Sequence, residues 1–128
     1  DCLLSRGLGD VYKRQPYGGG NTIEMLCNVN DTLYAVSFCH LSQTIYVSAG
    51  QSVSQGQAIA LSGNSGNSSG PHTHIEVYNL GSMSVSDAVA RFSAGADFAW
   101  GTGWSGTGTS CEAGKAAPCR ERPEKFFS

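Results

Sequence analysis

The stretch Gly70-Pro71-His72-Thr73-His74-Ile75-Glu76-Val77 carries two of the three histidines of this 128-residue chain. Ile75 and Val77 favour a β-strand, in which side chains two residues apart point to one face and lie about 6–7 Å apart. We therefore expect His72 and His74 to face the same way. One imidazole can then bind a metal ion while the other handles the protons of a bound water.

The residues on either side of the two histidines predict their surroundings. Small polar residues fill the segment 62–70, which predicts a loop, and Pro71 lacks the backbone donor that a strand interior needs. We therefore expect an open groove above the histidines. Glu76 shares a strand face with both of them, so it can orient one ring as a second-shell residue; a solvent-exposed carboxylate is the alternative.

Three further stretches precede the His-x-His strand, in a fixed order. They are His40-Leu41-Ser42, the segment 47–60 with its repeated Gly-Gln pairs, and Ser62-Gly63-Asn64-Ser65-Gly66. Taken together, the four stretches resemble the lysostaphin/LytM-type zinc endopeptidases, metallopeptidase family twenty-three, from about residue 17 to residue 78. The resemblance implies an all-β fold: an antiparallel β-sandwich with Gly-rich turns, of the LytM/duplicated-hybrid type.

The same resemblance implies a chemistry and a substrate. Family members hydrolyse peptide bonds in bacterial peptidoglycan, in the stem peptide or the cross-bridge, outside the cell and associated with its wall. One zinc ion is held by a His and an Asp from a His-x-x-x-Asp motif and by the histidine that matches His74. By motif, His40 and His72 are the catalytic residues that transfer protons and stabilise the oxyanion.

The expected His-x-x-x-Asp motif is absent, since no histidine precedes His40. A single imidazole does not hold zinc at useful affinity, so we expect the 128-residue chain to be an N-terminally truncated, inactive fragment. Residues 5–15 resemble the translation of a sequencing adapter, and we treat residues 1–15 as a non-native leader; a native polar arm is the alternative. Residues 16–82 are then a partial peptidase β-domain core, 83–96 a short helix and 97–128 a cysteine-containing C-terminal extension.

Within the core, the runs 22–27 and 33–41 flank a polar turn and predict an antiparallel hairpin. A short helix is predicted around 84–92, where Val85, Val89 and Phe92 recur at i, i+4 and i+7 and Ser84 or Ser86 is the N-cap. Phe98, Trp100 and Trp104 in the extension favour capping the sandwich over a sugar-stacking platform. These three aromatic residues lie in a Gly- and Thr-rich context.

The composition of the chain argues against nucleic acid and the membrane interior as partners. Eight Lys and Arg stand against ten Asp and Glu, a net charge of −2, and the basic residues form no stripe for nucleic acid. No apolar run approaches the ~18 residues of a membrane span, and we expect a monomer.

Beyond Cys2 in the leader, four cysteines favour two disulfides and an oxidising compartment, with Cys111–Cys119 and Cys27–Cys39 as the favoured pairs. Free buried thiols are the alternative.

Three other functions remain open on sequence grounds. An inactive LytM-like domain would bind cell wall or activate a partner hydrolase. A Cys/His amidase would use Cys39 with His72, but Cys39 lies in mid-strand, where nothing stabilises a thiolate. A purely structural β-domain is the third. The absence of lysine between residues 15 and 115 excludes a biotinyl or lipoyl carrier. If His40 lies on the opposite face from His74, the catalytic assignment fails.

Overall fold

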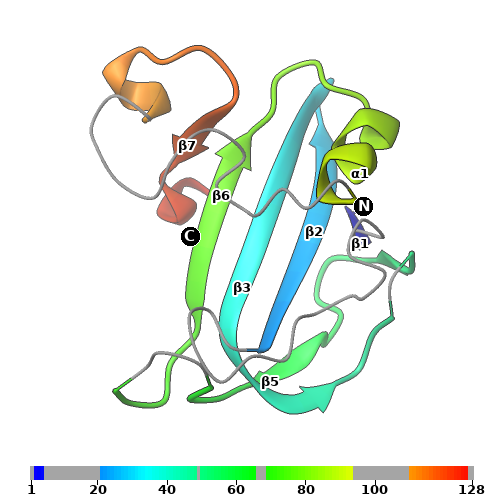
Figure 1. The fold of residues 1–128 in the computed structure, drawn as a ribbon, viewed down its shortest axis with the longest axis vertical. Coiled ribbons are helices and arrows are strands. Elements are labelled where there is room, and N and C mark those ends of the chain that lie inside the picture. The colour runs from blue at the N-terminus through cyan, green and yellow to red at the C-terminus, as the bar shows by residue number, and fades with distance from the viewer. Residues whose placement is uncertain (1, 5–20, 49, 66–68, 94–109, 127–128) are drawn as a thin grey trace.

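The computed structural model describes residues 2–4, 21–48, 50–65, 69–93 and 110–126, with the main chain alone for 2–4 and 91–93. The strands are β1 (Cys2–Leu4), β2 (Asn21–Val29), β3 (Thr32–Ile45), β4 (Ser52–Val53), β5 (Ala60–Ser62), β6 (His74–Asn79) and β7 (Cys119–Glu121). The helix α1 spans Val85–Ser93, and two short 3-10 helices, η2 (Cys111–Ala113) and η3 (Pro123–Lys125), flank β7 (Figure 1).

All strands in the described residues pair antiparallel in one sheet of order β4-β1-β2-β3-β6-β7, with β5 added to β3. This arrangement confirms the all-β, antiparallel class with one short helix. The strand β1 lies inside the segment predicted to be a non-native leader, and it pairs with both β2 and β4. The origin of residues 1–15 stays a prediction.

The strands β2 and β3 form a hairpin in the middle of the sheet, and this confirms the predicted antiparallel hairpin. Its two-residue turn is Asn30-Asp31, with φ of 51° and 65°. These positive angles match the type I′ turn that suits the twist of two paired strands, and Asn and Asp tolerate them. β3 continues beyond residue 41, where we had predicted its end, and its last residues pair with β5.

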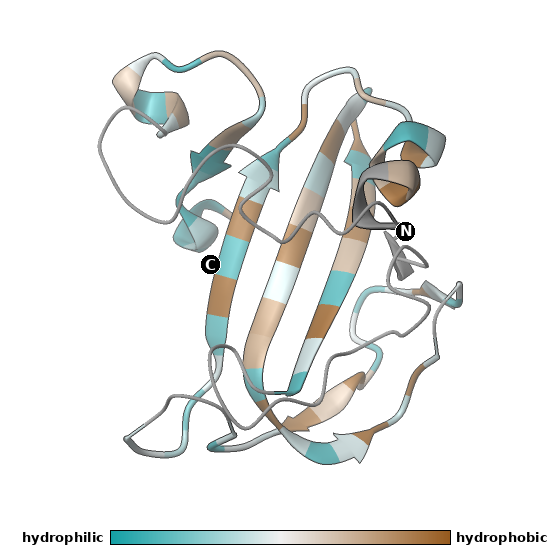
Figure 2. Ribbon diagram, viewed as in Figure 1, coloured by the Kyte–Doolittle hydropathy of each residue, from teal (hydrophilic) through white to brown (hydrophobic). Residues whose placement is uncertain are grey.

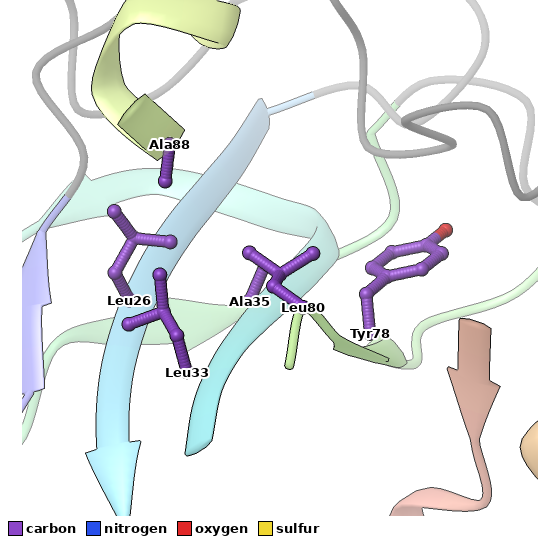
Figure 3. Close-up of a cluster of buried hydrophobic side chains, with 6 residues drawn as sticks. All are labelled: Leu26, Leu33, Ala35, Tyr78, Leu80 and Ala88. Atoms are coloured by element: carbon purple, nitrogen blue, oxygen red, sulfur yellow. The ribbon is translucent and has the colours of Figure 1, made fainter. Parts of the chain in front are cut away.

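Apolar residues occupy much of the long strands β2 and β3, as the hydropathy colouring of Figure 2 shows, and the buried ones form two clusters. The first cluster lies under α1, whose Ala88 is fully buried (Figure 3). The second consists of Ile23, Leu41, Val47 and Val53. Period-two alternation places these two sets on opposite faces of the sheet, so each face has its own core.

The helix α1 begins as predicted. Ser84 Oγ accepts a hydrogen bond of 3.1 Å from the backbone amide of Asp87, which makes Ser84 the N-cap. Val85 and Val89 pack against the first cluster. The side chain of Phe92 lies outside the described residues, as do Phe98, Trp100 and Trp104, so their predicted roles stay predictions.

One predicted disulfide is confirmed and the other is wrong. Cys111 and Cys119 are bonded, with Cα atoms 5.1 Å apart. Cys39 is a free, buried thiol, whereas Cys27 is oxidised and lies opposite Cys2 in the β1–β2 register. Cys27 pairs with Tyr34 in the hairpin, five residues along β3 from Cys39, or roughly 16 Å at the rise of a strand. A disulfide needs Cα atoms within about 7 Å, so this pair cannot form.

Within the part of the chain that the structure describes, no helix is both long enough and apolar enough to cross a membrane.

Gly63 marks a close approach between two segments that lead to the histidines. A Cβ there would lie 2.6 Å from the backbone nitrogen of Ser42 and 2.8 Å from Leu41 C. Its carbonyl accepts a 2.9 Å hydrogen bond from His72 N. The absence of a side chain at Gly63 therefore lets the loop before β6 contact the main chain of β3.

We expect Gly63→Ala to destabilise the fold by about 1–3 kcal/mol, because the new methyl group must push backbone apart. Gly70→Ala is the matched control, since a Cβ at Gly70 meets no atom within 4 Å. Chemical denaturation of both variants measures the difference. Equal midpoints for the two would contradict the close approach.

Candidate active site

The three histidines of the chain converge, as predicted. The ring centroid of His40 lies 4.7 Å from that of His72 and 6.2 Å from that of His74. His40 comes from β3, His72 from the loop before β6, and His74 from the first position of β6. His72 and His74 thus share one site with His40, which precedes them by 32 and 34 positions in the sequence.

A β-bulge gives His40 its orientation. The β2–β3 register shifts between the pairs Ile23↔Phe38 and Asn21↔Leu41, so β3 contains one additional residue there. His40 has a φ of 63°, and it is only 9% exposed. Cys39 pairs with His74, and Leu41 packs in the cluster on the other face. The left-handed residue between them therefore keeps its side chain on the His74 face.

Ser65 holds this bulge in place. Its hydroxyl donates to Leu41 O at 2.6 Å and accepts from Asn21 N at 3.0 Å. Its own carbonyl lies 2.8 Å from His40 Nδ1. A carbonyl oxygen only accepts, so Nδ1 of His40 carries a proton and Nε2 of the neutral ring carries the lone pair.

His72 is held in the same way. Its Nδ1 lies 2.7 Å from Gly70 O, which again places the proton on Nδ1 and the lone pair on Nε2. The side chain is exposed, unlike that of His40. Backbone carbonyls thus select the same tautomer in two of the three imidazoles.

His74 is oriented by a carboxylate. Its Nε2 lies 3.3 Å from Glu76 Oε1, and the two side chains are 44% and 3% exposed. Glu76 is therefore buried, and the solvated alternative that we considered is wrong. The contact favours the His74 tautomer with its proton on Nε2, which leaves the lone pair on Nδ1.

Two residues around Glu76 were not predicted. Tyr78 Oη donates to Glu76 Oε2 at 2.6 Å, and Arg120 Nη2 donates to Oε1 at 2.9 Å. Burial, and then the hydrogen bond to Glu76, raise the pKa of the Tyr78 hydroxyl, which therefore stays a donor. Tyr78 lies two residues after Glu76 on one strand face, so strand periodicity contained a signal for it. Arg120 comes from a separate segment, and nothing local in the sequence points to it.

Cys39 lies next to this site but lacks the properties of a nucleophile. It is 1% exposed, and burial, followed by the charges of Glu76 and Glu24, raises the pKa of its thiol to about 12. A thiol with that pKa is almost entirely protonated at neutral pH. The geometry therefore disfavours the Cys/His amidase.

The described residues do not form a metal site on their own. They contain no group of three or more His, Cys, Asp or Glu side chains arranged to hold a metal ion. The predicted zinc does not fit this set of donors by itself, because a protein zinc site uses at least three protein ligands.

A groove of about 710 Å³ lies away from the histidines. Its lining includes Met25, Val36, Phe38, Val53 and Phe126, and none of the three histidines. These side chains belong to the face of the second cluster. The groove is therefore separate from the imidazole site.

Residues 4–86 match the model of peptidase family M23. The chain belongs to peptidase family M23. Three curated relatives of this M23 chain align with about half of it. The peptidoglycan DD-endopeptidases ShyA and ShyB of Vibrio cholerae are 42% and 39% identical over 71 and 67 residues, which is 56% and 52% of this chain and 15% of each relative. A metalloprotease of Haemophilus influenzae is 44% identical over 61 residues, 48% of this chain and 12% of its own length.

The M23 chain thus spans only a small part of its curated relatives. Among solved structures, a catalytic-domain mutant of the prophage-encoded M23 protein EnpA from Enterococcus faecalis has a TM-score of 0.49 at 25% identity. That match covers 62% of this chain and 55% of the other.

The strain at His40 can be measured by comparing two substitutions. His40→Gly and His40→Ala both remove the imidazole and its bond to Ser65 O. Glycine accepts a φ of 63° without cost, whereas alanine does not. We expect His40→Gly to be the more stable by about 1 kcal/mol in denaturant titrations. A more stable alanine variant would show that residue 40 is not in the left-handed region.

Cys39 is expected to resist alkylation in the folded protein. At pH 8 in iodoacetamide, peptide mapping should find Cys39 unmodified in buffer and modified in urea, because both burial and its raised pKa protect it. Rapid alkylation of Cys39 in buffer would instead support the Cys/His amidase, above all if alkylation abolished an activity that chelators do not affect.

Proposed function

We propose that this chain carries the histidine-bearing part of a zinc-dependent endopeptidase site that hydrolyses peptide bonds in bacterial peptidoglycan. The observation that carries the proposal is the convergence of His40, from β3, with His72 and His74, from the stretch that leads into β6. Membership of family M23 supports the peptidase class. Two relatives are named peptidoglycan DD-endopeptidases, which supports the substrate.

His40 and His72 are suited to proton transfer. Each has Nδ1 held by a backbone carbonyl, so each neutral ring offers the Nε2 lone pair as a base. A protonated ring donates from the same Nε2 and can stabilise an oxyanion. The buried, bulge-held His40 is the more fixed of the two and therefore suits the role of oxyanion donor, and the exposed His72 suits proton exchange with water.

His74 is suited to metal binding. With Nε2 facing Glu76 at 3.3 Å, its Nδ1 carries the lone pair that a metal requires. A zinc ion bound there would polarise the scissile carbonyl and lower the pKa of a coordinated water towards ~7. Two more protein donors, the His and the Asp of the expected motif, are needed. All three histidines of the chain already lie in the cluster, so no histidine is left for that motif. We therefore infer that the 128-residue chain does not hold zinc tightly and is inactive.

A secreted, cell-wall-associated location is part of the proposal. The Cys111–Cys119 disulfide supports it, because disulfides persist in oxidising compartments outside the cytosol. Peptidoglycan is reached in the same compartments.

The test uses the 128-residue chain and a longer chain recovered from the same gene. We expect the longer chain to carry a His-x-x-x-Asp motif, to bind one zinc per chain, and to release peptides from purified peptidoglycan. Activity should fall by at least 10²-fold with a chelator or with His74→Ala, since removing a zinc ligand removes the activated water. The 128-residue chain should release nothing.

Thr73→Ala is the matched control, because residue 73 lies between the two histidines but carries no imidazole. It should retain zinc and activity. Hydrolysis that survives both the chelator and His74→Ala would overturn the proposal. Binding to peptidoglycan without any hydrolysis by the longer chain would instead establish the inactive, wall-binding alternative.

A further inference from the structure

Residues 110–126 form a unit that adds the strand β7 to the edge of the sheet. The strand β7 pairs with β6, with Arg120 opposite Tyr78, and the Cys111–Cys119 disulfide ties its first residue to η2 (Figure 1). The family match ends at residue 86, so this unit lies outside it. Its contribution to the histidine site therefore comes from outside the residues that match the family.

Arg120 contacts the carboxylate that faces His74. Its Nη2 lies 2.9 Å from Glu76 Oε1, the same oxygen that lies 3.3 Å from His74 Nε2. The second oxygen, Oε2, accepts from Tyr78 Oη at 2.6 Å. Both oxygens of a carboxylate that is 3% exposed are thus fixed, one of them by a guanidinium that is 27% exposed.

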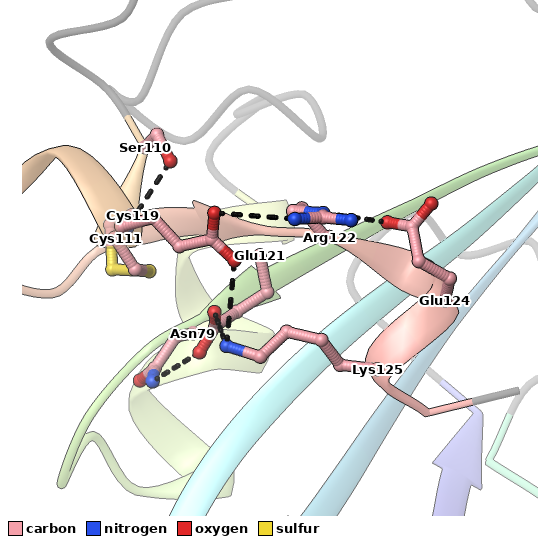
Figure 4. A network of polar contacts seen from close by, with 9 residues as sticks. Asn79, Ser110, Cys111, Cys119, Glu121, Arg122, Glu124 and Lys125 are labelled. Atoms are coloured by element: carbon pink, nitrogen blue, oxygen red, sulfur yellow. Dashed lines mark hydrogen bonds and ion pairs between the residues drawn. A yellow bond between two sulfur atoms is a disulfide. The ribbon is translucent and has the colours of Figure 1, made fainter. Parts of the chain in front are cut away.

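The position of Arg120 is itself determined by the surrounding unit. Besides the disulfide, Asn79 Nδ2 donates to Glu121 Oε2 at 3.2 Å, and Lys125 Nζ donates to Glu121 Oε1 at 3.1 Å (Figure 4). These contacts hold the residues on either side of Arg120 against β6. The guanidinium therefore reaches Glu76 from a restrained backbone, which lowers the entropy lost in forming the contact.

We propose that Arg120 is a positioning residue for His74, acting through Glu76. By fixing Oε1, the guanidinium determines where the carboxylate meets Nε2, and so determines the orientation and tautomer of the ring. The functional meaning of this arrangement rests on the proposed metal-binding role of His74. The positioning itself does not, and it is measurable without metal or substrate.

The experiment records the ring nitrogens of His74 by two-dimensional ¹H–¹⁵N NMR in the metal-free 128-residue chain. In the wild type we expect one tautomer, with the proton on Nε2. In Arg120→Gln, Glu76 loses the donor that fixes Oε1, and the His74 nitrogen shifts should move towards those of a tautomer mixture. Thermal unfolding of each variant shows that the shift is recorded on folded protein.

Arg122→Gln is the matched control. Arg122 lies two residues away in the same unit and also pairs with a carboxylate, Glu124, but its side chain is 62% exposed and does not contact Glu76 in the ion pairs described. Its His74 spectrum should equal that of the wild type. Movement of the His74 shifts in both variants would show a general loosening of the edge and would overturn the proposal.

Arg120→Lys covers the case in which the glutamine variant does not fold. Lysine keeps a positive charge beside buried Glu76 but lacks the rigid fork of the guanidinium. We expect a shift of the His74 nitrogens in the same direction as in Arg120→Gln and of smaller size. A wild-type His74 spectrum in folded Arg120→Gln, or in Arg120→Lys if the glutamine variant is unfolded, would overturn the proposal whatever the chain hydrolyses.

Discussion

The buried carboxylate of Glu76 is the constraint on which the rest of the site depends. A carboxylate removed from water is strongly destabilising unless hydrogen bonds and opposite charge compensate it. Tyr78, Arg120 and His74 all contact Glu76, and they belong to two strands that are 40 residues apart in sequence or more. The need to satisfy one side chain thus connects the edge strand, the apolar cluster to which Tyr78 belongs, and the site histidines.

On the opposite side of the site, a bulge in the main chain of β3 positions His40. His40 would face away from His74 in a regular strand, and one additional residue with a positive φ turns it back. Carbonyls of Ser65 and Gly70 then select the tautomers of His40 and His72. Main-chain groups therefore set the protonation pattern of two imidazoles, and a side chain sets that of the third. The different partners are consistent with different chemical roles.

Local patterns predicted much of this structure. The Asn-Asp turn, the hairpin, the Ser84 cap and the strand of His74 all follow from turn chemistry and periodicity, and the family resemblance placed His40 beside the other histidines. The predicted Cys27–Cys39 pair was wrong, although the hairpin itself excludes it: Cys27 lies opposite Tyr34, and Cys39 lies five positions further along β3. Tertiary contacts were not predictable in this way. Arg120 reaches Glu76 from 44 residues away, and no local pattern indicates such a contact.

The edge strand β7 shows that a family boundary and a folding boundary need not coincide. The family match ends at residue 86, yet the main chain of β6 forms a ladder with residues 119–121. An expression clone designed to stop at residue 86 would expose the edge of β6 to intermolecular pairing and would remove the cation beside its buried acid. A clone of this chain is therefore better ended after Lys125, which holds Glu121, than at the limit of sequence similarity.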